Sequence, residues 1–371
     1  MTVYVSVLCL LLYFTFSSIL LHRKQYSKTV LAASLIILAL LSAFRSYNVG
    51  TDTSRYAQYF QWMKAGSYYC PMEFGYCSLT NYIAHTSLTF QVVLIIEAVI
   101  LYSSLYFFVK EFVKYEYWSL SVLLFYIVQS FFVSMNTSRQ YFALGFVLFT
   151  ILLWRRCKFF PAFVVFLVAV SIHYAAIICL IFVFFEKKKN KYTNIIFLGA
   201  YLLSICVRFL GVDKLLTFFL NLIPKYSHYI GSNQFLVSDS LISILPQILI
   251  PNILFIFIIL YSNKEKVHDD LSDKNACDEG VLSWCALSYV CLLNMFAGSM
   301  ALSRFSDYFV IPFICFLLSF LNNYFSKKKF EAFSLLIILI LVYTLLMWIY
   351  IFILGNNEVV PYEISNFLLV E

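Results

Sequence analysis

The chain has 371 residues, of which 62% are hydrophobic and only 12% are charged. A soluble globular domain carries about 25% charged residues, so this composition excludes an ordinary soluble domain and indicates a protein embedded in lipid. The net charge of +7 does not indicate nucleic-acid binding, because basic residues of a membrane protein lie in its loops and set its orientation.

Apolar runs long enough to cross a bilayer recur along the whole chain. A spanning helix needs about 20 apolar residues. No basic residue precedes the first run, which favours a retained span over a cleaved signal peptide. We therefore expect an all-α polytopic membrane protein that forms a single domain over residues 1–371. The predicted membrane segments, in chain order, are 3–21, 29–46, 90–109, 117–135, 140–154, 159–185, 192–210, 241–262, 281–301, 308–325 and 331–354.

Basic residues separate the loops into two sets. The loops HRKQYSK, KEFVK, RRCK, EKKKNK, NKEKVHDDLSDK and SKKK hold 18 of the 26 Lys and Arg residues. The positive-inside rule predicts that these loops are cytoplasmic. Both termini then lie on the outer side, together with two large loops at 47–89 and 211–240, the second of which begins with a short helix expected to lie in the membrane interface.

The segment 159–185 is too long for one ordinary span and has basic loops at both ends. Two half-length helices that turn near SIHY, residues 171–174, would keep both ends in the cytoplasm. Such a turn must be covered by protein or line a wet cavity. We expect this re-entrant hairpin, so that about eleven membrane segments include one that does not cross. The alternative is one long tilted helix.

The outer side carries arginine where topology alone requires no positive charge. Arg45, Arg139 and Arg304 each lie within a few residues of a predicted span end. The planar guanidinium binds phosphate with two parallel hydrogen bonds. The three arginines are therefore predicted to bind a pyrophosphate. They could instead extend toward the interface as anchors, or form structural ion pairs with acids such as Asp52, Glu73 or Asp307.

The loop 47–89 contains the most polar stretch of the outer side. GTDTSRYAQYFQWMKAG predicts a helix whose N-cap is Thr51, Asp52 or Thr53 and which ends at Gly66. Cys70 and Cys77 flank a Pro and a Gly on the oxidising side, so a disulfide is expected, with two free thiols as the alternative. Glu97 lies within a predicted span, where an ionisable side chain is a functional candidate.

Five motifs follow one another along the chain in an order that is familiar from one family: RSYNVGTDTSRYAQYF, MEFGY, NTSRQYFALG, SIHYAA and SRFSDYF. Together they resemble the EpsG-type family of Wzy-like bacterial polysaccharide polymerases, and the resemblance covers most of the chain. VVPYEISNF near the C-terminus resembles a Pro-Tyr feature of that family. The resemblance implies a GT-C-like membrane glycosyltransferase of the bacterial inner membrane, facing the periplasm. It would transfer the glycan of one undecaprenyl pyrophosphate to a second lipid-linked repeat unit.

This chemistry gives each polar residue an expected role. Asp52, Glu73 or His173 would be the base for the attacking sugar hydroxyl, and the three arginines would stabilise the pyrophosphate leaving group. No metal-binding acid pair occurs on the outer side, so we expect no metal and no other cofactor. Residues of the same motifs are expected to contact the acceptor or shape its loop: Thr51, Thr53, Arg55, Tyr56, Gln140 and Tyr308.

Two other functions fit many of the same features. A flippase or transporter for lipid-linked glycan would also need arginines and a wet cavity, but transporters more often have internal repeats and charges at mid-membrane. An O-antigen ligase would perform the same chemistry on another acceptor. The expected partners are the lipid-linked oligosaccharide, membrane lipids and a chain-length regulator, with no nucleic acid. O-antigen and capsule are both open as products.

The distribution of basic loops gives a direct test of topology. Reporter fusions at Lys188 and Lys328 should give a cytoplasmic signal, and a fusion at Gly231 should give a periplasmic signal. The Lys188 fusion is the informative one, because a single long helix over 159–185 would place it outside. A periplasmic signal there would overturn the hairpin.

Overall fold

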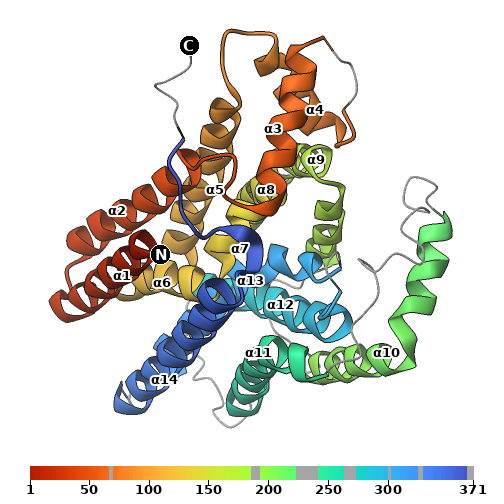
Figure 1. Ribbon diagram of the computed structural model, residues 1–371. Helices are drawn as coiled ribbons and strands as arrows, with labels where there is room; N and C mark the ends of the chain where they lie inside the picture. Colours follow the sequence, from red (N-terminus) through yellow and green to blue (C-terminus); the bar gives the residue numbers. More distant parts are fainter. Residues whose placement is uncertain are drawn as a thin grey trace. The chain divides into compact units, whose positions relative to one another are not determined.

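A computed structural model describes residues 1–66, 70–184, 193–222, 241–262, 273–299, 302–324 and 329–365 (Figure 1). The prediction of an all-α protein is confirmed for these residues, whose only β-type pairing is an isolated antiparallel bridge between Arg45 and Ile364. Five of their helices are long and apolar enough to cross a membrane, or six if one bent helix pair forms a span. The count of eleven segments stays a prediction.

The chain divides into two compact units. The first unit consists of Met1–Leu180 with Phe325–Glu371, and the second of Ile181–Tyr324. The helices that begin in the first unit are α1 (Thr2–Leu21), α2 (Lys24–Ala43), α3 (Thr51–Lys64), α4 (Phe74–Ala84), α5 (Phe90–Phe112), η1 (Tyr115–Tyr117), α6 (Trp118–Ile127), α7 (Ser130–Asn136), α8 (Ser138–Arg155), α9 (Phe159–Ile172), η2 (Tyr174–Phe184), α14 (Lys329–Met347), the π-helix η4 (Trp348–Ile353) and η5 (Asn356–Glu358).

The second unit contains α10 (Thr193–Leu222), α11 (Leu241–Ser262), α12 (Asp273–Phe296) and α13 (Arg304–Tyr324). α12 contacts the other three helices. Asn252 of α11 donates to the side chain of Asn294 of α12 at 2.8 Å, and Asn294 donates to Ser204 of α10 at 3.2 Å. These bonds pair polar groups that hydrocarbon would leave unsatisfied.

The helix α10 extends further than the sequence predicted, because it continues to Leu222 where the outer loop 211–240 was expected to begin. The rest of that loop lies outside the described residues, as do the basic loop at 186–191 and most of those at 263–274 and 326–329.

Three basic loops meet at one end of the first unit. His22 and Lys114 both contact the carboxylate of Glu116, at 3.5 and 2.9 Å. Glu111 pairs with Arg155 and with Arg156. HRKQYSK, KEFVK and RRCK therefore lie on the same side, as their charge predicted.

α5 packs between α2 and α8, and α8 packs along α9. Gly145 of α8 lets α5 approach closely, since a Cβ there would lie 2.9 Å from a side-chain carbon of Ile100 and 3.2 Å from its backbone. At the far end of the unit, α4 contacts α9 in the same way. A Cβ on Gly75 would lie 2.3 Å from the Ser171 hydroxyl and 2.9 Å from its carbonyl carbon.

Two predicted segments are interrupted. The segment 117–135 is a bent pair, α6 and α7, with an angle of 56° between them and a left-handed Gln129 (φ 71°) at the break. The predicted hairpin breaks where expected: α9 ends at Ile172, His173 is extended, and the 3₁₀-helix η2 begins at Tyr174. The return of the chain to the cytoplasmic side stays a prediction.

The C-terminal segment after η4 packs against the N-terminal helices. The Tyr4 hydroxyl donates to the Val359 carbonyl at 2.8 Å, and the Tyr362 hydroxyl donates to the Leu41 carbonyl at 3.0 Å. Backbone bonds join Ser46 to Glu363 at 2.7 Å and Gly50 to Glu358 at 3.0 Å. Figure 1 shows this segment passing beside the start of α1 and the end of α2. The N-terminus and the end of η4 therefore lie on the same side of this unit.

The close contact between α4 and α9 predicts a large effect for Gly75→Ala. The new methyl group meets the Ser171 backbone, which cannot rotate away, so we expect a loss of about 1–3 kcal/mol in unfolding free energy. Thermal unfolding of the purified protein in detergent measures it. Gly199→Ala is the matched control, because nothing lies within 4 Å of a Cβ at that helical position. Equal stability of the two variants would contradict the contact.

Candidate functional site

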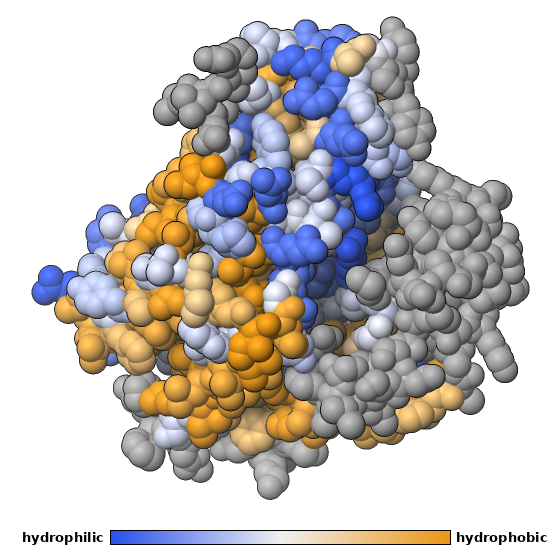
Figure 2. Space-filling view, in the orientation of Figure 1, coloured by the Kyte–Doolittle hydropathy of each residue, from blue (hydrophilic) through white to orange (hydrophobic). Residues whose placement is uncertain are grey.

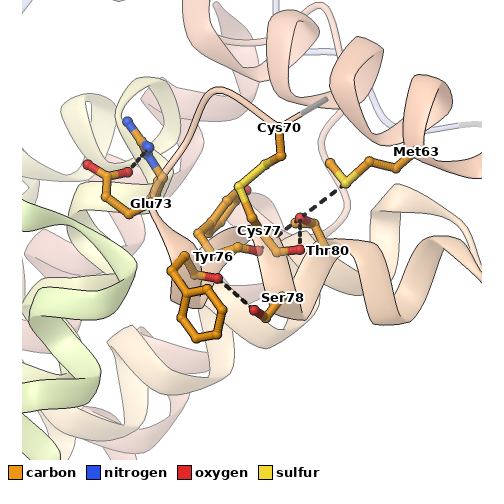
Figure 3. The surroundings of a disulfide bond; sticks show 9 residues. Met63, Cys70, Glu73, Tyr76, Cys77, Ser78 and Thr80 are labelled. Atoms are coloured by element: carbon orange, nitrogen blue, oxygen red, sulfur yellow. Dashed lines mark hydrogen bonds and ion pairs between the residues drawn. A yellow bond between two sulfur atoms is a disulfide. The ribbon is translucent and has the colours of Figure 1, made fainter. Parts of the chain in front are cut away.

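Glu73 lies at the N-terminus of α4, in a short loop closed by a disulfide. Cys70 and Cys77 are bonded, with their Cα atoms 6.1 Å apart, which confirms the predicted disulfide. The Cys77 amide also donates to the Glu73 carbonyl at 2.9 Å. Figure 3 shows the Glu73 side chain pointing away from the disulfide, toward a guanidinium group. The covalent ring therefore fixes the backbone from which this carboxylate extends.

The Glu73 carboxylate joins three segments that are distant in sequence. It pairs with the Arg139 guanidinium in the first turn of α8. Its other oxygen lies 3.6 Å from Nδ1 of His173, and it accepts from the Tyr174 amide at 3.4 Å. Two of the three predicted base candidates and one predicted arginine thus lie together.

This cluster is only partly open to solvent. The Glu73 side chain is 8% exposed, and those of Arg139 and His173 are 17% and 18% exposed. The Arg139 guanidinium lies over the rings of Tyr56 and Tyr76, 5.7 and 5.9 Å from their centroids. Aromatic faces stabilise a cation without neutralising it, so Arg139 remains positively charged here.

A second carboxylate lies deeper in the membrane. Glu97, about two turns into α5 and 4% exposed, accepts from the Tyr76 hydroxyl at 2.9 Å. It also interacts electrostatically with Arg45. Tyr76 therefore lies between the two carboxylates, with its ring near Arg139 and its hydroxyl on Glu97.

Arg45 is almost completely buried, at 2% exposure, just after α2. One of its nitrogens donates to the Ser42 carbonyl, while Nε and the second terminal nitrogen have no hydrogen-bond partner within the described part of the chain. Burial lowers the pKa of this guanidinium, and the negative charge of Glu97 opposes that shift. Arg45 and Arg139 both interact electrostatically with Glu97.

The remaining predicted residues are distributed over several places. Thr53 is buried and donates to the Met135 carbonyl at 3.1 Å, so it anchors α3 and does not face an open site. Gln140, in α8, is also buried. The Asp52 amide donates to the side-chain oxygen of Asn136 at 3.0 Å. Arg304 and Tyr308 belong to α13 in the second unit, so their part in a common site stays a prediction.

The start of α3 corrects one detail of the sequence reading. The N-cap is Gly50, not Thr51, Asp52 or Thr53. Gly50 has φ +94° and lies so close to α7 that a Cβ would be 2.8 Å from the Met135 carbonyl oxygen. Only glycine combines that backbone angle with that approach. The expected stop at Gly66 is confirmed, since α3 ends at Lys64 and Gly66 has φ +88°.

Sequence reasoning did not predict the contacts of two further residues, Asn136 and Tyr76. Asn136 holds the start of α3 through the Asp52 amide and contacts Asn357 of the C-terminal segment at 3.2 Å. Tyr76 donates its hydroxyl hydrogen to Glu97. Their position inside the motifs MEFGY and NTSRQYFALG could have indicated them, because the same motifs contain residues that were predicted to belong to the site.

The sequence was compared with protein families, curated proteins and solved structures. The model of the EpsG family matches residues 28–364, nearly the whole chain. The chain belongs to the EpsG family. These are Wzy-like polysaccharide polymerases, which confirms the resemblance seen in the motifs. No curated protein and no solved structure matches the chain.

The EpsG-family match includes every member of the cluster around Glu73. The cluster offers an acceptor for a proton, an imidazole and a fixed cation, which are the groups that transfer of a sugar from a phosphate leaving group requires. Within the described residues, no group of three or more His, Cys, Asp or Glu side chains could hold a metal ion. Metal independence stays a prediction.

Substitutions at the ion pair separate charge from geometry in this EpsG-family protein. Arg139→Lys keeps the positive charge and loses the two-pronged contact, so we expect the protein to reach the membrane and polymer formation to fall at least about tenfold. Glu73→Gln should have a similar effect, because it leaves Arg139 without its charged partner. Polymer is measured on gels of surface glycan, with protein level as the reference.

The matched control is Arg156→Lys at the opposite end of α8, which also pairs with a glutamate but is exposed. It should leave polymer unchanged. Normal polymer from Arg139→Lys would show that the guanidinium geometry at this site is not used.

Proposed function

We propose that this protein polymerises lipid-linked oligosaccharide repeat units at the outer face of the bacterial inner membrane. The observation that carries the proposal is the cluster of Glu73, Arg139 and His173, in a chain that belongs to a polymerase family. The donor would be a glycan on undecaprenyl pyrophosphate, and the acceptor a second lipid-linked unit. The product would be O-antigen or capsular polysaccharide.

The depth of the cluster supports a lipid-anchored donor. Arg139 and Arg155 lie on the same helix, 16 residues and about 24 Å apart. Arg155 belongs to the end where the basic loops meet, at the cytoplasmic boundary. The hydrocarbon layer is about 30 Å thick, so Arg139 lies close to the opposite boundary. A pyrophosphate held by its polyprenyl chain occupies that same level.

The ion pair suggests how the leaving group is received. Arg139 would exchange Glu73 for pyrophosphate oxygens, and this exchange would release the carboxylate to accept the proton of the attacking hydroxyl. Asp52, one helix turn before Tyr56, is a second candidate for that proton. Arg45 would act from its buried position by adding positive potential beneath the cluster. A role for Arg304 at the pyrophosphate stays a prediction.

His173 is better placed as a hydrogen-bond donor than as the base. Its Nδ1 accepts from the Ala175 amide at 3.3 Å, so the neutral ring carries its hydrogen on Nε2. In that tautomer the Nδ1 lone pair is occupied by the Ala175 amide, and the Nε2–H group can donate to a substrate oxygen. We therefore propose that a carboxylate accepts the proton and that His173 donates a hydrogen bond to a substrate oxygen.

Deletion of the gene in its bacterium tests the proposed function. A polymerase is needed only to extend the chain, so we expect surface glycan to shift from a ladder of lengths to a single repeat unit on its acceptor. Gels of lipopolysaccharide and capsule measure this, and complementation with the intact gene should restore the ladder.

The same gel separates the other functions. Loss of every repeat unit would indicate a flippase or a ligase. Without a flippase no unit is exported, and without a ligase no unit is attached. An unchanged ladder would overturn any essential role in assembly of that glycan.

A further inference from the structure

The outward side of α3 forms one wall of a groove that is separate from the Glu73 cluster. The groove has a volume of about 570 Å³, which falls in the range of about 300–1,000 Å³ typical of small-molecule sites. Figure 2 shows hydrophilic residues gathered over this part of the molecule, beside an apolar surface. Its lining residues are Tyr47, Asn48, Thr51, Ser54, Arg55, Ala57, Gln58 and Gln61.

α3 has two faces with different chemistry. Tyr56, Phe60 and Met63 are buried against the rest of the unit, and Tyr56 lies against Arg139. The groove residues lie on the other face, where Arg55, Gln58 and Gln61 are exposed and make no side-chain hydrogen bond or ion pair with the residues that the structure describes. One helix therefore contacts the ionic cluster on one side and presents unbonded donors and acceptors on the other.

The polar row continues into an exposed aromatic residue. Trp62 follows Gln58 by four positions and Arg55 by seven, so it lies on the same face of the helix. It is 42% exposed, and its ring is held edge-on by Tyr59 with the centroids 5.4 Å apart. A fixed, exposed ring next to a row of amides and hydroxyls gives an apolar surface beside hydrogen-bonding groups.

The charge of the groove limits its ligand. None of its lining residues carries a carboxylate, and Arg55 supplies a positive charge. Asn48 of the lining donates to the carboxylate of Glu363 at 3.5 Å. Amides, hydroxyls and one guanidinium match a ligand rich in hydroxyls that is neutral or acidic. A cationic ligand would find no partner in the lining.

We propose that this groove binds sugar residues of the lipid-linked glycan chain, as a subsite separate from the pyrophosphate site. The inference rests on the proposed function and extends it. Hydroxyl groups of the glycan would bond Gln58 and Gln61, an acidic or hydroxyl group would meet Arg55, and a sugar face would lie on Trp62. Because α3 also contacts Arg139 through Tyr56, a glycan held here remains near the reacting end of its lipid carrier.

Binding is tested with glycan that carries no lipid. The probe is oligomer of known repeat number, released by mild acid from the bacterium's own surface polymer. It is titrated calorimetrically into the full-length protein in detergent. Gln58→Ala/Gln61→Ala should weaken binding about tenfold, because two hydrogen bonds to the ligand are lost. In cells the same variant should still join repeat units but give shorter chains.

Lys64→Ala is the matched control, since Lys64 is exposed on the same helix and does not line the groove. It should leave both affinity and chain length unchanged. Trp62→Ala tests the proposed stacking of a sugar on the indole ring, and it should also weaken binding of the oligomer.

The possible results separate this inference from the proposed function. If the intact protein binds no released oligomer, or if the double variant and the Lys64 control bind equally, the glycan subsite is overturned, even when gene deletion abolishes polymer. If deletion leaves the polymer ladder unchanged, the polymerase function fails, whatever the groove binds.

Discussion

The outer end of the first unit depends on pairing charges where hydrocarbon would not tolerate them alone. Removing a charge from water costs several kcal/mol unless a partner and further hydrogen bonds compensate it. Glu97 is compensated by the Tyr76 hydroxyl and by the charge of Arg45. Glu73 is compensated by Arg139, at the point where α4, α8 and the end of α9 meet. The positions of these helix ends are therefore determined by charge pairing as well as by apolar packing, and the disulfide and Gly75 hold α4 at the distance that the pairing requires.

The C-terminal segment adds a constraint on topology. Because the Tyr4 hydroxyl bonds the Val359 carbonyl, the start of α1 and the end of η4 lie on one side, so the chain between them crosses the membrane an even number of times. Eleven crossings would separate them. Ten crossings and a re-entrant hairpin at 159–185 satisfy the bond, and the break at His173 lies where that hairpin needs its turn. The turn is also covered by protein, since His173 and the Tyr174 amide both contact Glu73.

Sequence alone was sufficient for features that depend on local pattern. The apolar runs predicted α1, α2, α5 and α8 to within a few residues, and the basic loops predicted which helix ends lie together. Contacts between residues that are distant in sequence were harder to predict. Arg139 was identified as functional, but nothing local indicates that Glu73, 66 residues earlier, is its partner. Thr53 was expected to contact the acceptor or to shape its loop. Its bond to the Met135 carbonyl could not be predicted, because a hydroxyl in a polar motif has the same local signal in either role. The bend between α6 and α7 could not be predicted, because the residue with the left-handed backbone at the break is Gln129 and not a glycine.

The polar stretch that opens α3 is best understood from the demands on its two faces. One face must be apolar and aromatic, because Tyr56 lies against Arg139 of the ionic cluster and Phe60 is buried against Phe90. The other must stay hydrophilic, because it lies at the membrane surface beside the groove. The start of such a helix must be fixed if each face is to keep its orientation. The positive φ of Gly50 and the bond between the Asp52 amide and Asn136 both fix it. Asn136 is in turn held by Asn357 from the C-terminal segment. The orientation of α3, and with it the separation between ionic cluster and groove, therefore depends on residues from three distant parts of the chain, all within the stretch that the family match covers.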